Sequence, residues 1–237
     1  MTLRVTKQIT YVLLVVVAVS TTLGACNKVL GETPIQGVVN TALDHSIETL
    51  TSKGASYRSQ KNTMERLHGP DLRDPNRSSI KFDLYQEVTY ERLPPDRERA
   101  VMVSWREYAD EPEVRYPVNN CDLTWVVIAT ESFDQACDGS WSQSIVSKTN
   151  TSVEADLRDV VDVDALTQVD DAVHRNLAVA VYEGFASEGG ELRHVLFKIG
   201  LDDGVIRYAS INAATVAIEW EHFDLRSTDI VIKVPTL

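Results

Sequence analysis

The chain has 237 residues and a formal net charge of −12 at pH 7, and 43% of its residues are hydrophobic. This length and composition fit a leader followed by one globular domain with a sizeable core. An acidic surface argues against binding to a phosphate backbone, which relies on clustered lysine and arginine, so we expect no nucleic-acid partner.

Residues 1–25 are typical of an export signal. Arg4 and Lys7 give a basic start without an acidic residue, residues 9–19 are nearly all apolar, and small residues precede Cys26. A membrane-spanning helix needs about 20 apolar residues. The apolar run here is shorter, so we expect the segment to be cleaved.

The residues Leu23, Gly24, Ala25 and Cys26 resemble the lipobox of bacterial lipoproteins. The resemblance implies that Cys26 is the first mature residue, that it carries fatty acyl chains such as palmitate, and that residues 26–32 form a lipidated tether. Two or more acyl chains make a stable anchor. The expected location is the cell membrane or the outer membrane, with the domain facing the periplasm or the exterior. An ordinary signal with a chance cysteine, or an uncleaved anchor, is the alternative.

Only Cys121 and Cys137 remain once Cys26 is assigned to lipid. An oxidising compartment favours the pairing of two such thiols, and a bridge between them would close a loop of about 17 residues, which is worth about 3 kcal/mol. Two free thiols or half of a metal site are the alternatives. Because no Cys-x-x-Cys occurs and the five histidines are scattered, we expect a disulfide, no metal and no cofactor.

Two segments have helical periodicity. Thr33, Pro34 and Gln36 form a capping pattern, and apolar residues at helical spacing follow it, which predicts a helix that ends near Lys53. A second helix is expected over residues 153–163, where apolar residues share one face.

After Gly54 the apolar period changes to two. From Ile80 to Tyr90 the even positions are mostly apolar and the odd positions mostly polar, as in a strand with one buried face. Similar runs predict strands at Val101–Trp105, Val114–Val118, Leu123–Thr130, Trp141–Val146, Leu177–Phe185, Leu192–Leu201, Val205–Ser210, Thr215–Phe223 and Ile230–Val234.

The order of helix, strands, helix and strands, with short hairpin connections, predicts an α+β fold. We expect one domain over residues 33–237, a curved antiparallel sheet or incomplete β-barrel of about 10–11 strands that wraps an N-terminal helix and a mid-chain helix.

Two groups of strand and turn segments carry a family resemblance. The first runs from Leu123 to Glu131 and continues at residues 138–141; the second comprises residues 195–211, 220–223 and 230–235. Both resemble the LolA/LolB-like superfamily, which includes the LppX/LprG type of lipoproteins. The resemblance implies an incomplete antiparallel barrel that wraps helices and opens into an apolar cavity for acyl chains. The cysteine pair and the many acidic residues depart from the pattern of that family.

No motif that carries catalysis occurs in the sequence, neither a G-x-S-x-G elbow nor a phosphate-binding glycine loop nor a metal-binding H-E-x-x-H pattern. Ser104 stands in a strand pattern without a histidine nearby in the sequence. Asp162 with Asp164, and Asp170 with Asp171, are interpreted as surface acids in loops. We therefore expect a protein that is not an enzyme.

Large apolar residues on the predicted strand faces are the candidate lining of a ligand cavity, because aromatic side chains recur where an apolar pocket meets water. These residues are Phe82, Leu84, Trp105, Trp125, Val127, Phe197, Ile199 and Trp220. For each of them, packing against the helix expected at residues 33–53 is the alternative.

The leading hypothesis is a lipid-anchored, exported binding protein without enzymatic activity that holds or carries an acyl chain, a lipid or a lipoprotein in an apolar cavity. The alternative is an envelope sensor or interaction module that binds a membrane signalling partner through its surface. The first hypothesis requires a cavity, whereas the second requires a filled interior with an exposed apolar patch or an open sheet edge.

Overall fold

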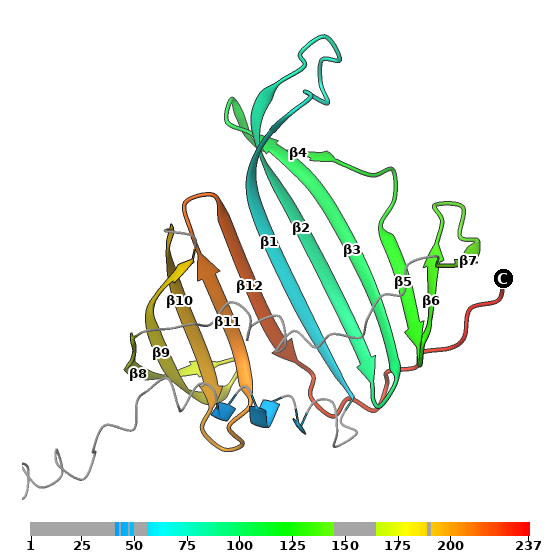
Figure 1. Ribbon diagram of the computed structural model, residues 1–237. Coiled ribbons are helices and arrows are strands. Elements are labelled where there is room, and N and C mark those ends of the chain that lie inside the picture. Colours follow the sequence, from blue (N-terminus) through cyan, green and yellow to red (C-terminus); the bar gives the residue numbers. More distant parts are fainter. Residues whose placement is uncertain (1–40, 43, 47, 50–55, 145–164, 189–190) are drawn as a thin grey trace, which may run out of the picture.

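The computed structural model describes residues 41–42, 44–46, 48–49, 56–144, 165–188 and 191–237. In this part of the chain twelve strands form one sheet (Figure 1). The strands are β1 (Tyr57–Gly69), β2 (Ile80–Leu93), β3 (Arg97–Tyr108), β4 (Glu111–Pro117), β5 (Leu123–Ile128), β6 (Glu131–Gln135), β7 (Trp141–Gln143), β8 (Ala165–His174), β9 (Leu177–Glu188), β10 (Glu191–Gly200), β11 (Ile206–Asn212) and β12 (Val216–Phe223).

The sheet is open and antiparallel throughout its described pairings. Its order is β7-β6-β5-β3-β2-β1-β12-β11-β10-β9-β8, and β4 pairs with β3. Two meanders, β1 to β7 and β8 to β12, are therefore joined where β1 pairs with β12, and β7 and β8 stand at opposite edges (Figure 1). The curved, unclosed antiparallel sheet predicted from the sequence is confirmed, with slightly more strands than expected.

The sequence pattern does not predict β1, β6 or β8. The central strand β1 has the sequence YRSQKNTMERLHG, which is mostly polar, but it pairs along most of its length with both β2 and β12. In β8, the register shifts between Gln168 and Asp170. The interpretation of Asp170 and Asp171 as loop acids is wrong, because both lie in this edge strand, although both side chains are exposed.

The last predicted strand, Ile230–Val234, is not a strand in the structure. Its burial nevertheless alternates, because Ile230 and Ile232 are buried whereas Val231 is 65% exposed. The two buried side chains pack with Val126 of β5, and Arg97 donates a hydrogen bond to the carbonyl oxygen of Ile232 at 3.1 Å. The period of two therefore reflects a segment that lies against the sheet without joining it.

Helix is scarce in the described residues. Residues 41–42 and 44–46 are helical; Ala42 joins a core cluster with β9 to β12, and the Ser46 hydroxyl accepts a hydrogen bond from the Ile206 backbone N–H at 2.9 Å. The signal, the tether, most of the helix expected at residues 33–53 and the helix expected at residues 153–163 lie outside the described residues. The expectation of a sheet that wraps two helices is thus not supported. Within the described chain, no helix has the length and apolar character needed to cross a membrane.

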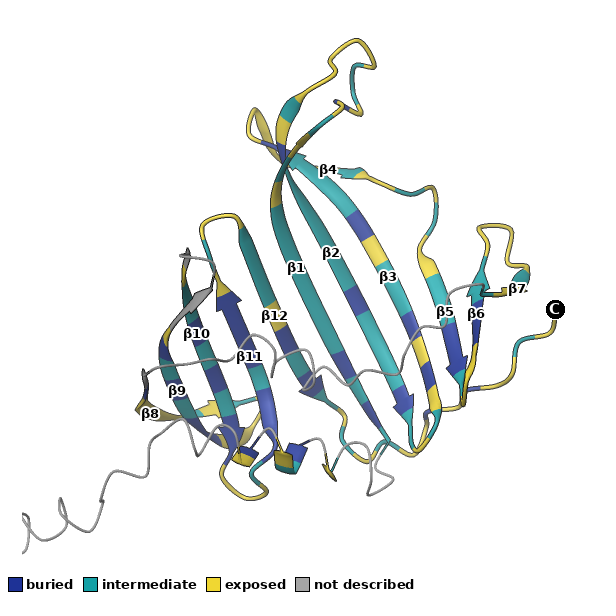
Figure 2. Ribbon diagram, viewed as in Figure 1, coloured by how far each residue is buried: buried dark blue, intermediate teal, exposed yellow. Residues whose placement is uncertain are grey.

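The face of the sheet that contacts Ala42 is here called the inner face. Residues opposite one another in register share a face, and Phe197, Ala209, Trp220, Lys61 and Val88 follow one another across β10, β11, β12, β1 and β2 on this side. Figure 2 shows that buried residues gather on β10 and β11 and near one end of β5. The opposite side is called the outer face.

An arginine connects the loop after β1 to the loop after β3. Asp71 is 3% exposed, and it accepts hydrogen bonds from the backbone N–H of Arg73 at 2.9 Å and from its guanidinium at 2.9 and 3.0 Å. Arg73 also donates to Asp110 at 3.0 Å and lies 3.9 Å from the ring centre of Tyr108. Hydrogen bonds from Arg73 lower the pKa of Asp71 to about 2.

We expect Asp71→Asn to lower the melting temperature at pH 7 and to have less effect as the pH falls. A carboxylate whose pKa is depressed on folding contributes stability above its unfolded pKa, which is about 3.9, and loses that contribution as the pH falls through its folded pKa. Thermal unfolding at pH 7 and near pH 2 measures the difference, with Asp122→Asn at an exposed position as the control. An equal difference at both pH values would contradict this account.

Candidate ligand-binding site on the inner face

The predicted lining residues fall mainly on one face of the sheet. Phe82, Leu84, Trp125, Val127, Phe197, Ile199 and Trp220 lie on the inner face. Trp105 lies on the outer face, where its ring stacks on that of Tyr85 with centroids 5.4 Å apart and planes 5° apart. Its indole N–H donates to Glu107 at 3.0 Å. The structure therefore brings seven of the eight residues to one side and separates Trp105 from them.

The half of the inner face formed by β9 to β12 is buried in the core. Phe197 and Trp220 are 0% and 2% exposed, and Ile199 is 6% exposed. All three belong to one core cluster, which Ala42 joins. These three residues pack in the core rather than around a hollow.

The other half of the inner face contains a hollow of about 440 Å³. Met102 of β3, Leu123, Thr124 and Trp125 of β5, and Asp134 and Gln135 of β6 line it. Leu123 is 36% exposed, and Tyr90 of β2 makes an edge-to-face contact with Trp125 at 6.3 Å. This open hollow, here called the β5 hollow, offers apolar surface of a kind that an acyl chain could cover.

A buried ion pair lies beside the β5 hollow. Arg92 and Glu98 face each other across the β2–β3 hairpin, with the Arg92 Nε 2.6 Å from a carboxylate oxygen and side chains 7% and 5% exposed. Arg92 also donates to the Tyr57 hydroxyl at 2.8 Å. Burial raises the pKa of Glu98, although Arg92 and a hydrogen bond with Trp125 oppose the shift. Glu98 thus links the ion pair to a residue that lines the hollow.

Sequence patterns alone do not single out this ion pair. The available signal is the Pro94-Pro95-Asp96 turn, because its short connection places Arg92 and Glu98 opposite each other. Charged residues are almost never buried unless they are paired, so two opposite charges at mirrored positions of a hairpin could have suggested the pair.

The inner face is more polar farther along β1 to β3. Thr63, Gln86 and Ser104 lie there in register, and Ser104 is 7% exposed. Its hydroxyl makes no hydrogen bond within the described residues. Among all the described residues, no group of three or more histidine, cysteine, aspartate or glutamate side chains is arranged to hold a metal ion.

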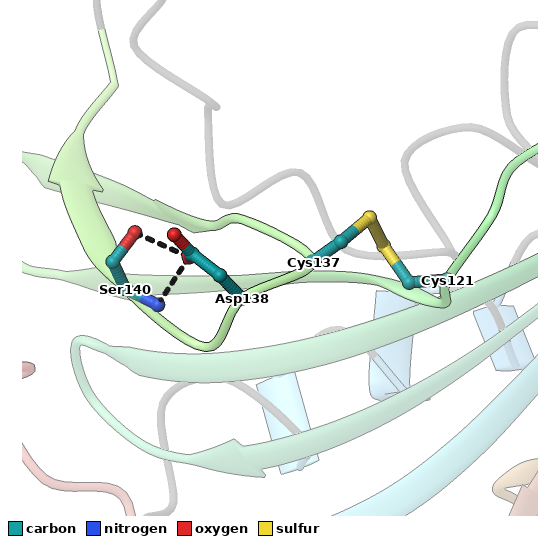
Figure 3. Close-up of a disulfide and its surroundings, with 4 residues drawn as sticks. All are labelled: Cys121, Cys137, Asp138 and Ser140. Atoms are coloured by element: carbon teal, nitrogen blue, oxygen red, sulfur yellow. Dashed lines mark hydrogen bonds between the residues drawn. A yellow bond between two sulfur atoms is a disulfide. The ribbon is translucent and has the colours of Figure 1, made fainter.

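The predicted disulfide is confirmed. Cys121 and Cys137 are bonded, with Cα atoms 5.5 Å apart (Figure 3). They flank the β5–β6 hairpin, which carries most of the lining of the β5 hollow. Beyond Cys137, Asp138 accepts hydrogen bonds from the Ser140 N–H at 2.9 Å and from its hydroxyl at 2.6 Å (Figure 3). The bridge therefore ties together the two strands of the candidate site.

No protein-family model and no curated protein sequence matches this chain. Among solved structures, it is similar to LppX of Mycobacterium tuberculosis, with 14% identity, a TM-score of 0.42, and coverage of 81% of this chain and 97% of LppX. It is also similar to LprF of Mycobacterium bovis, with 12% identity, a TM-score of 0.48, and coverage of 82% and 95%. A lipoprotein-sorting domain of Vibrio parahaemolyticus shows 7% identity, a TM-score of 0.22, and coverage of 83% and 93%. LppX and LprF are of the lipoprotein type that the sequence segments resemble.

Proposed function

We propose that this chain is an exported, lipid-anchored binding protein that holds an acyl chain of a lipid or a lipidated protein against the inner face of its sheet. In this proposal Cys26 carries the anchor, and the domain faces the periplasm or the exterior. The protein performs no covalent chemistry. The β5 hollow on an open, curved sheet is the observation that carries the proposal.

The mechanism is hydrophobic transfer. Each buried CH2 group contributes about 0.8 kcal/mol, so about ten of them favour the protein over water by about 8 kcal/mol. Met102, Leu123 and Trp125 supply the apolar contacts. Release then requires a membrane that competes for the same chain, and the tether keeps such a membrane within reach.

Retention of lipid by the purified protein tests the proposal. The full-length chain is expressed in a bacterial host, purified in mild detergent and analysed by native mass spectrometry. We expect a fraction that carries the additional mass of a lipid or fatty acid under native conditions and loses it under denaturing conditions, which separates a bound ligand from acyl chains attached to Cys26. A protein that retains no lipid and binds no fluorescent long-chain fatty acid would contradict the proposal.

A charge placed in the β5 hollow tests where the chain lies. We expect Leu123→Glu to weaken binding of a fluorescent long-chain fatty acid about tenfold, because an acyl chain cannot satisfy a buried carboxylate. Val103→Glu is the matched control, since Val103 is 38% exposed against 36% for Leu123 and lies on the outer face of the neighbouring strand. Titration of the probe measures both affinities, and equal losses in the two variants would place the chain elsewhere.

A surface feature favours a second candidate function, the binding of an envelope protein. Phe185 of β9 is 55% exposed and Leu192 of β10 is 64% exposed, and both lie on the outer face near the open edge formed by β8. Exposed apolar side chains beside an edge strand that has no further partner among the described strands are typical of interaction surfaces. A protein that retains no lipid but loses a specific partner on Phe185→Asp would favour this alternative.

A further inference from the structure

A second and larger hollow, of about 730 Å³, lies at one end of the sheet. It forms where the β8–β9 turn, the β10–β11 loop and the residues after β12 come together; the β10–β11 loop and the end of β12 lie at the same end of the sheet in Figure 1. Its lining includes three arginines, Arg175, Arg207 and Arg226. Three guanidinium groups at one hollow are unusual in a chain with a net charge of −12, and we call this hollow the arginine hollow.

The arginines retain hydrogen-bonding capacity toward a ligand. The side chain of Arg207 is 8% exposed and donates from Nη2 to Asp203 at 2.5 Å, whereas its buried Nε has no hydrogen-bond partner within the described residues. Arg175 uses Nε and Nη2 for Glu221, at 2.5 and 2.7 Å. A guanidinium offers five N–H donors, so neither arginine is fully used by these carboxylates.

Arg226 supplies the excess positive charge of the arginine hollow. Two acids also line the hollow, but Asp203 pairs with Arg207, and Asp224 pairs with Arg58 at 3.2 Å. In the part of the chain that the structure describes, the Arg226 side chain has no hydrogen bond or ion pair. Among the described residues, the guanidinium of Arg226 is therefore left to bind an external anion.

The backbone around the arginine hollow is unusual. Among the described non-glycine residues, five have a positive φ, and four of these line the hollow. They are Arg175 at 46°, Asn176 at 65°, Asp224 at 51° and Arg226 at 63°. Arg175 and Asn176 form the two-residue turn of the β8–β9 hairpin, in which a positive φ at both positions is the favoured geometry. Asp224 and Arg226 follow β12 and are not part of such a hairpin turn. The chain thus adopts a left-handed backbone, which is uncommon for side chains other than glycine, where it presents Arg226.

The arginine hollow also has apolar walls, and its lining at the end of β12 comes from both faces of the sheet, with His222 on the inner face and Phe223 on the outer face. Leu177, Phe223 and Leu225 line it together with His222. His222 stands two residues after Trp220 on β12, and residues two apart point to the same side of a strand. A ligand in this hollow therefore meets both cationic and apolar groups, which suits an anionic amphiphile.

We propose that the arginine hollow binds the oxoanion of a lipid headgroup, a phosphate or a carboxylate, with Arg226 as the donor and with Arg175 and Arg207 adding positive charge to the lining. This proposal rests on the proposed function, because it names the class of lipid that the protein holds. Guanidinium groups bind such oxoanions through charge-assisted hydrogen bonds. The acidic net charge of the chain does not exclude an anionic lipid, since the cationic groups are concentrated at this site.

A comparison of a long-chain fatty acid with its methyl ester tests the proposal on the full-length chain. The two probes share the acyl chain and differ only in the charge of the headgroup. We expect Arg226→Ala to weaken binding of the fatty acid about tenfold and to leave binding of the ester unchanged. Arg66→Ala is the control, because Arg66 is exposed and lies at the far end of β1, and it should change neither affinity.

The outcomes separate this inference from the proposed function. If the fatty acid and the ester bind equally and Arg226→Ala affects neither, the headgroup site is wrong whereas acyl-chain binding stands. If neither probe binds, the proposed function fails, and titration with inorganic phosphate decides the site. Phosphate binding that is lost in Arg226→Ala would then support a site for a free oxoanion, and no phosphate binding would overturn the site as well.

Discussion

Arg92→Met is expected to destabilise the fold by about 3–5 kcal/mol at pH 7, the usual effect of breaking a buried ion pair. The substitution removes the cation that lies 2.6 Å from Glu98 and leaves a carboxylate that is only 5% exposed. It also removes a hydrogen bond to Tyr57 at 2.8 Å and a cation–π contact with Tyr90 at 5.6 Å. Urea unfolding of the full-length chain measures the loss.

Glu98→Gln added to Arg92→Met is the matched control for that prediction. The large cost of breaking a buried pair comes from the unpaired charge that remains, so the double variant, which carries no charge at either position, should recover much of the lost stability. The pKa of Glu98 supports this expectation. Burial raises this pKa even in the presence of Arg92, so this position favours an uncharged side chain. A double variant that is less stable than Arg92→Met would show that the carboxylate has another stabilising role.

The pH dependence of Arg92→Met has a definite sign. Removal of the cation raises the pKa of Glu98 further, since Arg92 opposes the effect of burial. A group whose pKa is raised on folding contributes stability that is present below its unfolded pKa and lost as the pH rises through its folded pKa. The deficit of the variant should therefore shrink as the pH falls from 7 toward about 4.3, the unfolded pKa of glutamate, and an increasing deficit would contradict the assignment.

Strand periodicity predicts much of this sheet, because an antiparallel sheet with one covered face gives alternating apolar and polar residues. Ile80 to Tyr90 shows the pattern and lies within β2. The same argument fails for β1, whose inner-face residues include Lys61 and Thr63. β1 contributes Tyr57, which is fully buried, at its first position, but the polar residues that follow it do not give an alternating apolar pattern.

The candidate site is less predictable than the fold. Alternation assigns residues to a face within one strand, but which side of each strand faces inward depends on the register with its neighbours. Trp105 lies on the outer face for this reason, since it opposes Tyr85 rather than an inner-face residue of β2. Likewise, Arg175, Arg207 and Arg226 of the arginine hollow lie far apart in the sequence, and only the topology brings them together.

Replacement of Cys121 and Cys137 by serine is expected to lower the free energy of unfolding by about 3 kcal/mol, which for a chain of this size corresponds to a fall in melting temperature of about 6–12 °C. The bridge spans 16 positions of sequence, so it restricts the unfolded chain over the β5–β6 hairpin. Because Leu123 and Gln135 lie just inside the two cysteines and line the β5 hollow, the variant should also bind a fluorescent fatty acid more weakly. Reduction of the wild-type protein should reproduce both effects and leave the serine variant unchanged. Equal melting temperatures with and without the bridge would mean that the hairpin is held by its contacts with β3 alone, and the hollow would then not depend on the redox state of its compartment.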